Sequence, residues 1–390
     1  MKQSLKKSAS LMVHFATLVD PRVDRTKLHS LSDILVLSIC GFICGTDSWV
    51  DLQYFAEQRK EWFRTFLDLP NGIPSHDTFG RLFAMLDPEE FSRCFSSWVA
   101  AVANVTEGEI VAIDGKTLRR SFDRASKKAA IHMVSAWASR NGLVLGQVKT
   151  DERSNEITAI PKLLEILHLE GCIVTIDAMG CQREIAARIV EKGADYVISL
   201  KGNQGTLHDE VKDFLTEARA ENFETVPHAY QETLDKGHGR TERRRYWVTG
   251  VIDRIRQKEK WSTLTSVGMV EAERTIDGIT SLETRYFISS LPGDDAKKFA
   301  NAVRAHWGIE NSLHWVLDVA FREDECRVRK DNAPENVAML RHVALNLLKT
   351  MPTENKIFWT SRNTPRKVSI RSRRKLAGWS TDFLARCLGI

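Results

Sequence analysis

The order of apolar segments between residues 109 and 201 constrains the fold more than any other feature of this sequence. Apolar residues there alternate with polar ones, form short continuous runs, or recur at helical spacing. In chain order the segments are strands at 109–114, 130–139 and 142–150, a helix at 157–169, a strand at 172–177, a helix at 182–193 and a strand at 195–201. Because connections between parallel strands are right-handed, this order predicts an α/β domain in which three antiparallel strands are extended by parallel ones.

The regions on either side of this domain have different patterns. Residues 1 to about 105 have helical spacing, with Ser75 as an expected N-cap. Residues from about 202 to 295 are expected to form a β-rich insertion, with one helix, strands at 241–249, 264–273 and 281–291, and a turn at Asp277-Gly278. A long helical stretch begins near Asp294. We therefore predict a helical N-terminal domain (1–105), an α/β domain (106–350) and a basic tail (351–390).

Composition excludes several classes of protein. The 390 residues, of which 43% are hydrophobic, suffice for two or three domains with their own cores. The seven cysteines are scattered and form no C-x-x-C pair, which argues against a disulfide framework and favours the reducing cytoplasm. The longest apolar stretch, 34–45, is too short to cross a bilayer, so we expect no membrane role. The net charge of +5 permits a nucleic-acid partner without requiring one.

Two aspartates close two of the predicted strands. Asp114 follows the apolar run EIVAI, and Asp177 follows CIVTI. If these strands are neighbours, their ends bring two carboxylates to one edge of the sheet, where mutual repulsion favours a bound cation. Oxygen ligands of this kind suit Mg²⁺ or Mn²⁺. A structural interpretation is also open, because Asp114-Gly115 is a hairpin-turn dipeptide and Asp177 is a candidate cap for the next helix.

A third carboxylate is expected from the long helical stretch near residue 310. His306, Glu310, His314 and Asp318 are spaced by four residues and form one polar stripe on an otherwise apolar helix. A carboxylate in such surroundings needs a partner or a metal. The alternative is a solvated helix face on which two histidines flank Glu310. The sequence contains no H-E-x-x-H zinc helix.

Basic and amide side chains follow the candidate acids along the chain. The candidates for contact with a phosphate backbone are Lys116, Arg119 and Arg120, then Lys201, Asn203 and Gln204, then Arg240, Arg243, Arg244 and Arg245. The tail adds eight basic residues between Lys356 and Lys375 with no acidic one. Nothing in these runs encodes base reading, so the DNA backbone is the expected partner, and a solvated charged surface is the alternative.

These motifs together resemble the H-repeat-associated transposases, which are bacterial insertion-sequence proteins of the DDE type. The resemblance covers nearly the whole chain and rests on GIPSHDTFGRLF, IVAIDGKTLRRS, HMVSAWAS, TIDAMGCQ, KGNQ, RYFISSL and HWGIENSLHWVLDVAFREDECRVR. It implies a ribonuclease-H-like catalytic core with the β-rich insertion before the last acid. It also implies that Asp114, Asp177 and Glu310 are catalytic and hold two Mg²⁺ (or Mn²⁺) ions.

The resemblance further implies an activity and its partners. A transposase of this type cleaves the ends of its own element and joins them to target DNA in the bacterial cytoplasm. The expected partners are double-stranded DNA, as terminal inverted repeats and target, and a second copy of the chain on that DNA. The helix at 74–86 is expected to read the repeats, unless it is only a packing helix. Two other functions remain open: a DNA-binding protein that no longer transposes, and a metal-dependent nuclease without strand transfer.

The sequence departs from related DDE families around the third acid. Those families often carry a tyrosine, an arginine and a lysine there, whereas the matching positions hold Val303, His306 and Leu317. We predict a DNA contact for His306, which takes the place of the arginine. The departure also leaves Asp318 and Asp324 as alternatives for the third acid.

Overall fold

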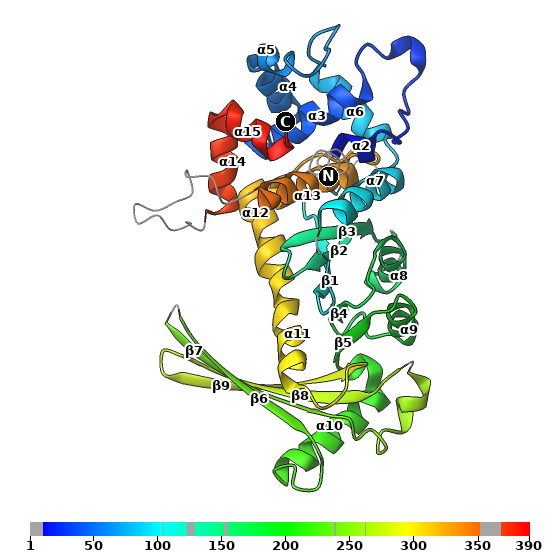
Figure 1. The fold of residues 1–390 in the computed structure, drawn as a ribbon, viewed down its shortest axis with the longest axis vertical. Coiled ribbons are helices and arrows are strands. Elements are labelled where there is room, and N and C mark those ends of the chain that lie inside the picture. The colour runs from blue at the N-terminus through cyan, green and yellow to red at the C-terminus, as the bar shows by residue number, and fades with distance from the viewer. Residues whose placement is uncertain are drawn as a thin grey trace, which may run out of the picture.

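In the described part of the chain, one nine-stranded sheet runs through most of the length of the molecule (Figure 1). The computed structural model describes residues 11–103, 105–122, 129–151, 155–237, 239–261, 263–351 and 368–390. The strands are ordered β3-β2-β1-β4-β5-β9-β8-β7-β6. Helices from both ends of the chain form a helical body at one end of the elongated molecule, and long strands together with one further helix form the other end. The predicted α/β class with a helical N-terminal region is confirmed.

The central strands have the predicted order and direction. They are β1 (Ile110–Thr117), β2 (His132–Ala138), β3 (Leu143–Lys149), β4 (Ile173–Ile176) and β5 (Asp195–Leu200). β1, β2 and β3 are antiparallel, and β1, β4 and β5 are parallel. Helices α8 (Glu156–Ile166) and α9 (Arg183–Glu191) connect the parallel strands on one face. All four residues of β4 are buried, which explains its continuous apolar sequence.

The β-rich insertion extends the same sheet and does not form a second one. It contains α10 (Gly205–Ala220), β6 (Ala229–Gly237), β7 (Arg240–Thr249), β8 (Ser266–Ile276) and β9 (Ile279–Ser289). β9 pairs antiparallel with β5, which joins the insertion to the core. The turn at Asp277-Gly278 is confirmed, with φ angles of 48° and 79° that suit a tight hairpin. β6 was not predicted, because this edge strand is largely exposed and polar.

One helical rod crosses the face of the sheet opposite α8 and α9 (Figure 1). It consists of α11 (Ala296–Ile309), a π-helical turn η4 (Glu310–His314) and α12 (Trp315–Phe321). Along β9, the Tyr286 hydroxyl lies 3.2 Å from Thr216 Oγ1 of α10, whereas the next residue, Phe287, packs edge-on against Phe299 of α11. Since consecutive strand residues point to opposite faces, α10 and α11 cover opposite sides of the extended sheet.

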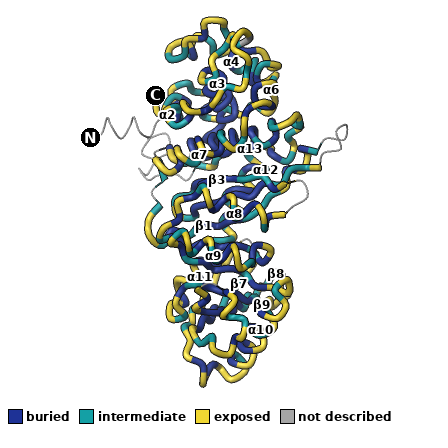
Figure 2. The backbone as a smooth tube through the Cα atoms, turned by 90° about the vertical axis from the view of Figure 1, so that its right-hand side faces the viewer, coloured by how far each residue is buried: buried dark blue, intermediate teal, exposed yellow. Residues whose placement is uncertain are grey.

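The helical body combines both ends of the chain. Its N-terminal helices are α2 (Leu11–Phe15), α3 (Leu31–Cys44), α4 (Trp49–Gln58), α5 (Lys60–Phe63), α6 (His76–Met85) and α7 (Pro88–Val102). They pack with α13 (Ala333–Thr350), α14 (Ile370–Trp379) and α15 (Thr381–Leu388). The Ser75 cap is confirmed, because its side chain accepts from Thr78 N. Figure 2 shows buried segments in both the helical end and the sheet, and one apolar core joins them.

The basic tail is partly built into this body. Arg373 Nη1 donates to the Leu348 carbonyl, and Arg374 donates to the carbonyls of Phe42, Ile43 and Ala320. Both side chains are buried, so the expectation that the tail contacts DNA is wrong for these two arginines, which serve as internal caps of helix ends. The basic residues between 352 and 367 lie outside the described residues.

Within the described ranges, no single helix is long and apolar enough to cross a membrane. α3 and α4 are long and apolar enough only when taken together, and they are bent by 98° relative to each other.

Candidate functional site

The parallel pairing of β1 with β4 places Asp114 and Asp177 at the same level of the sheet. Ile113 is the register partner of Ile176, and each aspartate is the next residue along the chain: Asp114 within β1, and Asp177 directly after the end of β4. Both side chains line one cavity of about 250 Å³. β1 continues through Asp114 to Thr117, so the hairpin-turn interpretation is wrong.

Asp177 begins the loop that follows β4. Its Oδ1 accepts the backbone N–H groups of Met179 at 2.9 Å and of Gly180 at 3.3 Å. The residue before α9 is Gln182, so Asp177 closes a local turn and does not cap that helix. This turn holds one carboxylate oxygen, which fixes the side chain at the cavity.

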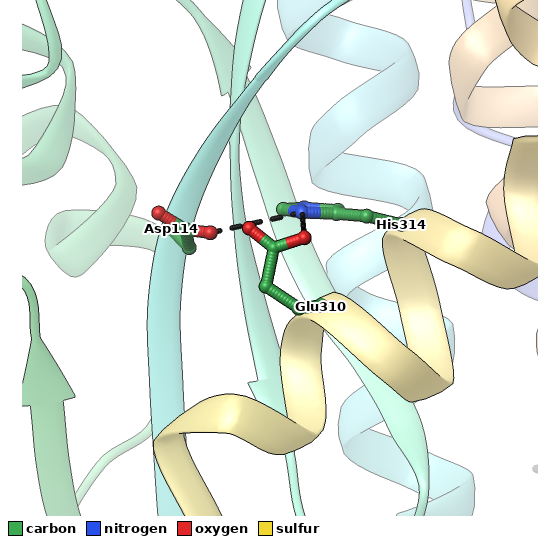
Figure 3. A group of neighbouring side chains, drawn as sticks. All are labelled: Asp114, Glu310 and His314. Atoms are coloured by element: carbon green, nitrogen blue, oxygen red, sulfur yellow. Dashed lines mark ion pairs between the residues drawn. The ribbon is translucent and has the colours of Figure 1, made fainter. Parts of the chain in front are cut away.

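Glu310 comes to the same cavity from the rod, at the start of the π-helical turn. Figure 3 shows its carboxylate between Asp114 and His314. His314 Nδ1 lies 3.5 Å from Glu310 Oε2 and 3.7 Å from Asp114 Oδ2. One ligand atom from each of the three residues lies within 4.8 Å of the others, a spacing that a single metal ion can bridge. π-helical turns of this kind are frequent at functional sites.

The two carboxylates have opposite pKa shifts. Burial, together with the neighbouring Glu310, raises the pKa of Asp114 from 3.8 to about 8. A hydrogen bond from His314 lowers the pKa of Glu310 to about 2, although its partial burial acts in the other direction. The metal-free pair therefore carries one proton at neutral pH, because two adjacent negative charges are unfavourable in a partly dry site.

Two histidines of the rod point to this site. From the sequence, His314 was expected only to flank Glu310 on the helix. In the structure it is 5% exposed and belongs to the cluster with Asp114 and Glu310. Its spacing of four residues from Glu310 was the available signal. His306 also lines the cavity, and its Nδ1 lies 3.1 Å from Thr175 Oγ1 on β4. Burial lowers the pKa of His306, so this ring is neutral at physiological pH.

The residues that follow β5 divide into two groups. Lys201 lines the cavity together with Glu283 and Arg285 of β9. In contrast, Asn203 donates to the Ala178 carbonyl at 2.6 Å, and Gln204 donates to the Cys181 carbonyl at 2.8 Å. These two amides hold the loop that carries Asp177. The hydrogen bonds account for the positions of both side chains without the contacts with DNA that were predicted for them.

The basic residues after Asp114 also divide. Lys116 lies in three ion pairs, with Asp318 at 2.6 Å, Glu323 at 2.9 Å and Asp324 at 3.5 Å. Asp318 and Asp324 therefore face Lys116, whereas Glu310 faces the cavity. Two exposed residues remain at the surface: Arg119, which pairs with Asp324 at 3.1 Å, and Arg120, whose carbonyl accepts from Arg329 Nε.

The pleat of β7 separates the four arginines that are adjacent in the sequence. Arg240 and Arg244 line a second cavity, of about 380 Å³, on the face covered by α11. Arg243 and Arg245 point to the other face. There Arg245 pairs with Glu271 and Glu273, and Arg243 lies 3.4 Å from Glu232. A DNA contact was predicted for all four arginines. At the second cavity only Arg240 and Arg244 are in a position to make it.

Comparison with known proteins places this geometry in a family. The family model described as the transposase DDE domain matches residues 106–347. The chain belongs to this transposase family. A second model, described as DDE_Tnp_1-associated, matches residues 12–99, which form most of the N-terminal part of the helical body. The family is consistent with divalent metal use at the Asp114–Glu310–His314 cluster.

Two relatives match this transposase over most of its length. "Putative transposase YncI" of Escherichia coli O157:H7 is 43% identical over 347 residues, which cover 87% of each chain. "H repeat-associated putative transposase YhhI" of Escherichia coli K12 is 39% identical over 383 residues, or 97% of each chain. The solved piggyBac transposase synaptic complex with hairpin DNA is 12% identical, with a TM-score of 0.42 over 97% of this chain and 77% of that chain. The two family models and the relative YhhI confirm the resemblance to H-repeat-associated transposases.

Proposed function

We propose that this transposase cleaves DNA at the ends of its insertion element and joins the freed ends to target DNA. One observation carries the proposal. Asp114, Asp177 and Glu310 are 63 and 133 residues apart in the sequence, yet they line one cavity from β1, the β4 loop and the π-helical turn. Three carboxylates brought together from separate elements are what a metal-dependent phosphoryl transfer needs.

The residues present fit a divalent cation. Burial and the neighbouring Glu310 raise the pKa of Asp114, so two negative charges are unfavourable side by side here and a bound cation would offset them. Carboxylate oxygens are ligands for Mg²⁺ or Mn²⁺, and His314 Nδ1 is a further donor atom within reach. Two such ions, when bound, lower the pKa of the attacking water and stabilise the leaving 3′ oxygen.

The protein's own side chains then bind and orient the DNA. Lys201 and Arg285 line the cavity beside the carboxylates and supply positive charge to the phosphate that reacts. Arg285 lies over the Trp307 ring, 5.2 Å from its centroid, and Glu283 holds the guanidinium with two hydrogen bonds of 2.7 Å. These contacts hold the Arg285 guanidinium where it lines both cavities.

A groove rich in arginine continues from this cavity and offers a path for the DNA backbone. The second cavity shares Glu283, Arg285 and Trp307 with the first. The lining of this second cavity has two carboxylates and a larger number of positive side chains. The positive side chains are Arg240, Arg244, Arg274, Arg285 and Arg304. Guanidinium groups bind phosphates through paired hydrogen bonds, so this groove is suited to a DNA strand that leads to the reacting phosphate.

Replacing both Arg240 and Arg274 by glutamine is expected to weaken binding of element-end DNA about 10-fold and to lower the slope of log K against log salt by about two. The slope falls because each arginine that no longer binds a phosphate leaves about one more counterion on the DNA. Fluorescence anisotropy across a salt series measures both quantities. R254Q is the matched control, because Arg254 stacks on Phe214 of α10 on the opposite face. An unchanged slope in the double variant excludes the groove from the DNA path.

Cation binding by the DNA-free protein is expected to strengthen as the pH rises toward about 8. The raised pKa of Asp114 means that a proton must leave before the carboxylate can bind metal. For the same reason, the metal-free protein loses stability as the pH rises from about 4 to about 8, because the folded chain holds a proton that the unfolded chain releases. Calorimetric titration with Mn²⁺ at several pH values tests this. A pH-independent affinity contradicts it.

The remaining parts of the proposal concern DNA ends and assembly. α6 carries exposed Asp77 and Arg81 on its outer side, while Phe79 and Phe83 pack inward, so reading of the terminal repeats by this helix stays a prediction. Joining two ends needs two active sites, and we expect a dimer on DNA. A footprint that is retained after deletion of residues 1–105 argues against the role of α6.

An assay with labelled element ends, Mg²⁺ and a target plasmid tests the proposed function. The expected products are cleaved ends and ends joined to the plasmid. Cleavage without joining identifies a plain nuclease. Binding of the ends without cleavage, with Mg²⁺ or with Mn²⁺, identifies a DNA-binding protein that no longer transposes. Short inverted repeats on both sides of the gene provide the DNA ends for the assay, and their absence favours a repurposed copy.

A further inference from the structure

The largely buried ammonium group of Lys116 connects the strand of Asp114 to the rod of Glu310. Lys116 lies two residues beyond Asp114 on β1, so both side chains are on the same face of the strand. Its Nζ contacts Asp318 Oδ1 at 2.6 Å, Glu323 Oε2 at 2.9 Å and Asp324 Oδ1 at 3.5 Å. Asp318 follows Glu310 by eight residues on the same rod, and the short helix η5 (Glu323–Glu325) comes directly after it.

The surroundings of Lys116 keep it in this position. The Glu323 side chain is 2% exposed, and its other oxygen lies 3.8 Å from Arg341 Nη1 of α13, which is 3% exposed. A buried carboxylate is unfavourable unless cations or hydrogen-bond donors surround it. If Lys116 turned to a DNA phosphate, Glu323 would lose its closest cation. The side chain of Lys116 is itself 12% exposed, which leaves little surface for a phosphate.

We propose that Lys116 is a positioning residue that sets the separation of Asp114 and Glu310, and that it does not bind DNA. This rests on the proposed function, in which both carboxylates hold the same metal centre. Strand and rod carry one of the carboxylates each, and the Lys116 contacts join the two elements beside the cavity. Displacement of reacting groups by about 1 Å costs about 100-fold in rate, so this connection determines how fast the site can work.

The test compares K116M and K116R with the wild type. K149M is the matched control, because Lys149 of β3 also pairs with a glutamate, Glu335, at 3.7 Å but lies outside the catalytic cavity. For K116M we expect a kcat of DNA cleavage about 10- to 100-fold lower and Mn²⁺ binding about 5-fold weaker. The Kd for DNA and its salt slope stay unchanged, and K116R recovers part of the kcat. Mn²⁺ binding is read by electron paramagnetic resonance on the DNA-free protein.

Three outcomes overturn the proposal. Wild-type kcat and Mn²⁺ affinity in folded K116M show that the connection is not needed. A salt slope lowered by about one, with unchanged Mn²⁺ affinity, shows that Lys116 contacts a phosphate. Equal losses in K149M show a general effect on the sheet.

If K116M does not fold, the double variant K116M/E323Q removes the buried charge of Glu323 as well and is measured in the same way. If the wild type does not cleave DNA, the proposed function fails, and Mn²⁺ binding by the variants still decides the role of Lys116.

Discussion

Replacing Asp114 by asparagine is expected to reduce DNA cleavage by roughly 1,000-fold or more, while the affinity for element ends stays within about twofold. The amide keeps the shape of the side chain but cannot supply the negative charge that holds a cation. Folding is expected to survive, because Asp114 is already protonated in the metal-free protein at neutral pH and the substitution replaces one neutral group by another. E310Q is expected to give a comparable loss of cleavage.

Cleavage of labelled ends under single-turnover conditions measures the rate, and anisotropy measures the affinity. D253N is the control, because Asp253 is an exposed carboxylate that pairs with Lys258 in the insertion, outside the catalytic cavity. Near-normal cleavage by D114N removes Asp114 from the catalytic set. A parallel loss of DNA binding shows that the carboxylate acts on folding or on DNA contact, contrary to the proposed mechanism.

The second large effect concerns stability. R374M is expected to lower the free energy of unfolding by roughly 3–5 kcal/mol, because a buried guanidinium hydrogen-bonded to several carbonyls is removed and those carbonyls lose their donors. Arg374 Nη2 donates to Phe42 at 2.8 Å near the end of α3, and Nη1 donates to Ala320 near the end of α12. Its guanidinium also lies 4.1 Å from the centroid of the Phe321 ring. Positive charge at two helix C-termini adds to the stabilisation.

Urea unfolding measures this difference, provided that the slope of the transition is unchanged. R371M is the matched control on the same helix, because Arg371 is exposed and its substitution should change stability by no more than about 0.5 kcal/mol. If R374M and R371M unfold at the same urea concentration, the internal role of Arg374 is wrong.

The pattern of apolar residues predicted the centre of the fold because that pattern is local. The continuous run of β4 and the helical spacing of α8 and α9 follow from burial of each segment on one or two faces. The adjacency of Asp114 and Asp177 follows from the parallel pairing of their strands. The merging of the insertion with the core sheet could not be predicted, because the pairing of β9 with β5 leaves no mark in either sequence.

Other features depend on side chains that are distant in the sequence. Lys116 looked like a DNA contact because Asp318, Glu323 and Asp324 lie about 200 residues away. The π-helical turn at Glu310–His314 has no marker in the residue pattern. The separation of Arg243 and Arg245 from Arg240 and Arg244 could be predicted only after β7 was known to be a strand, because only then does alternation apply.

The union of both chain ends in the helical body has a consequence for how the protein is made. Arg59 donates to the Gly378 carbonyl, and Arg374 reaches α3, so contacts span more than 300 residues. While the ribosome is still synthesising the sheet, the first helices have emerged without α13, α14 and α15 to cover them. The first-made part of the nascent chain can therefore complete its packing only after α13, α14 and α15 have left the ribosome, which is long after its own synthesis.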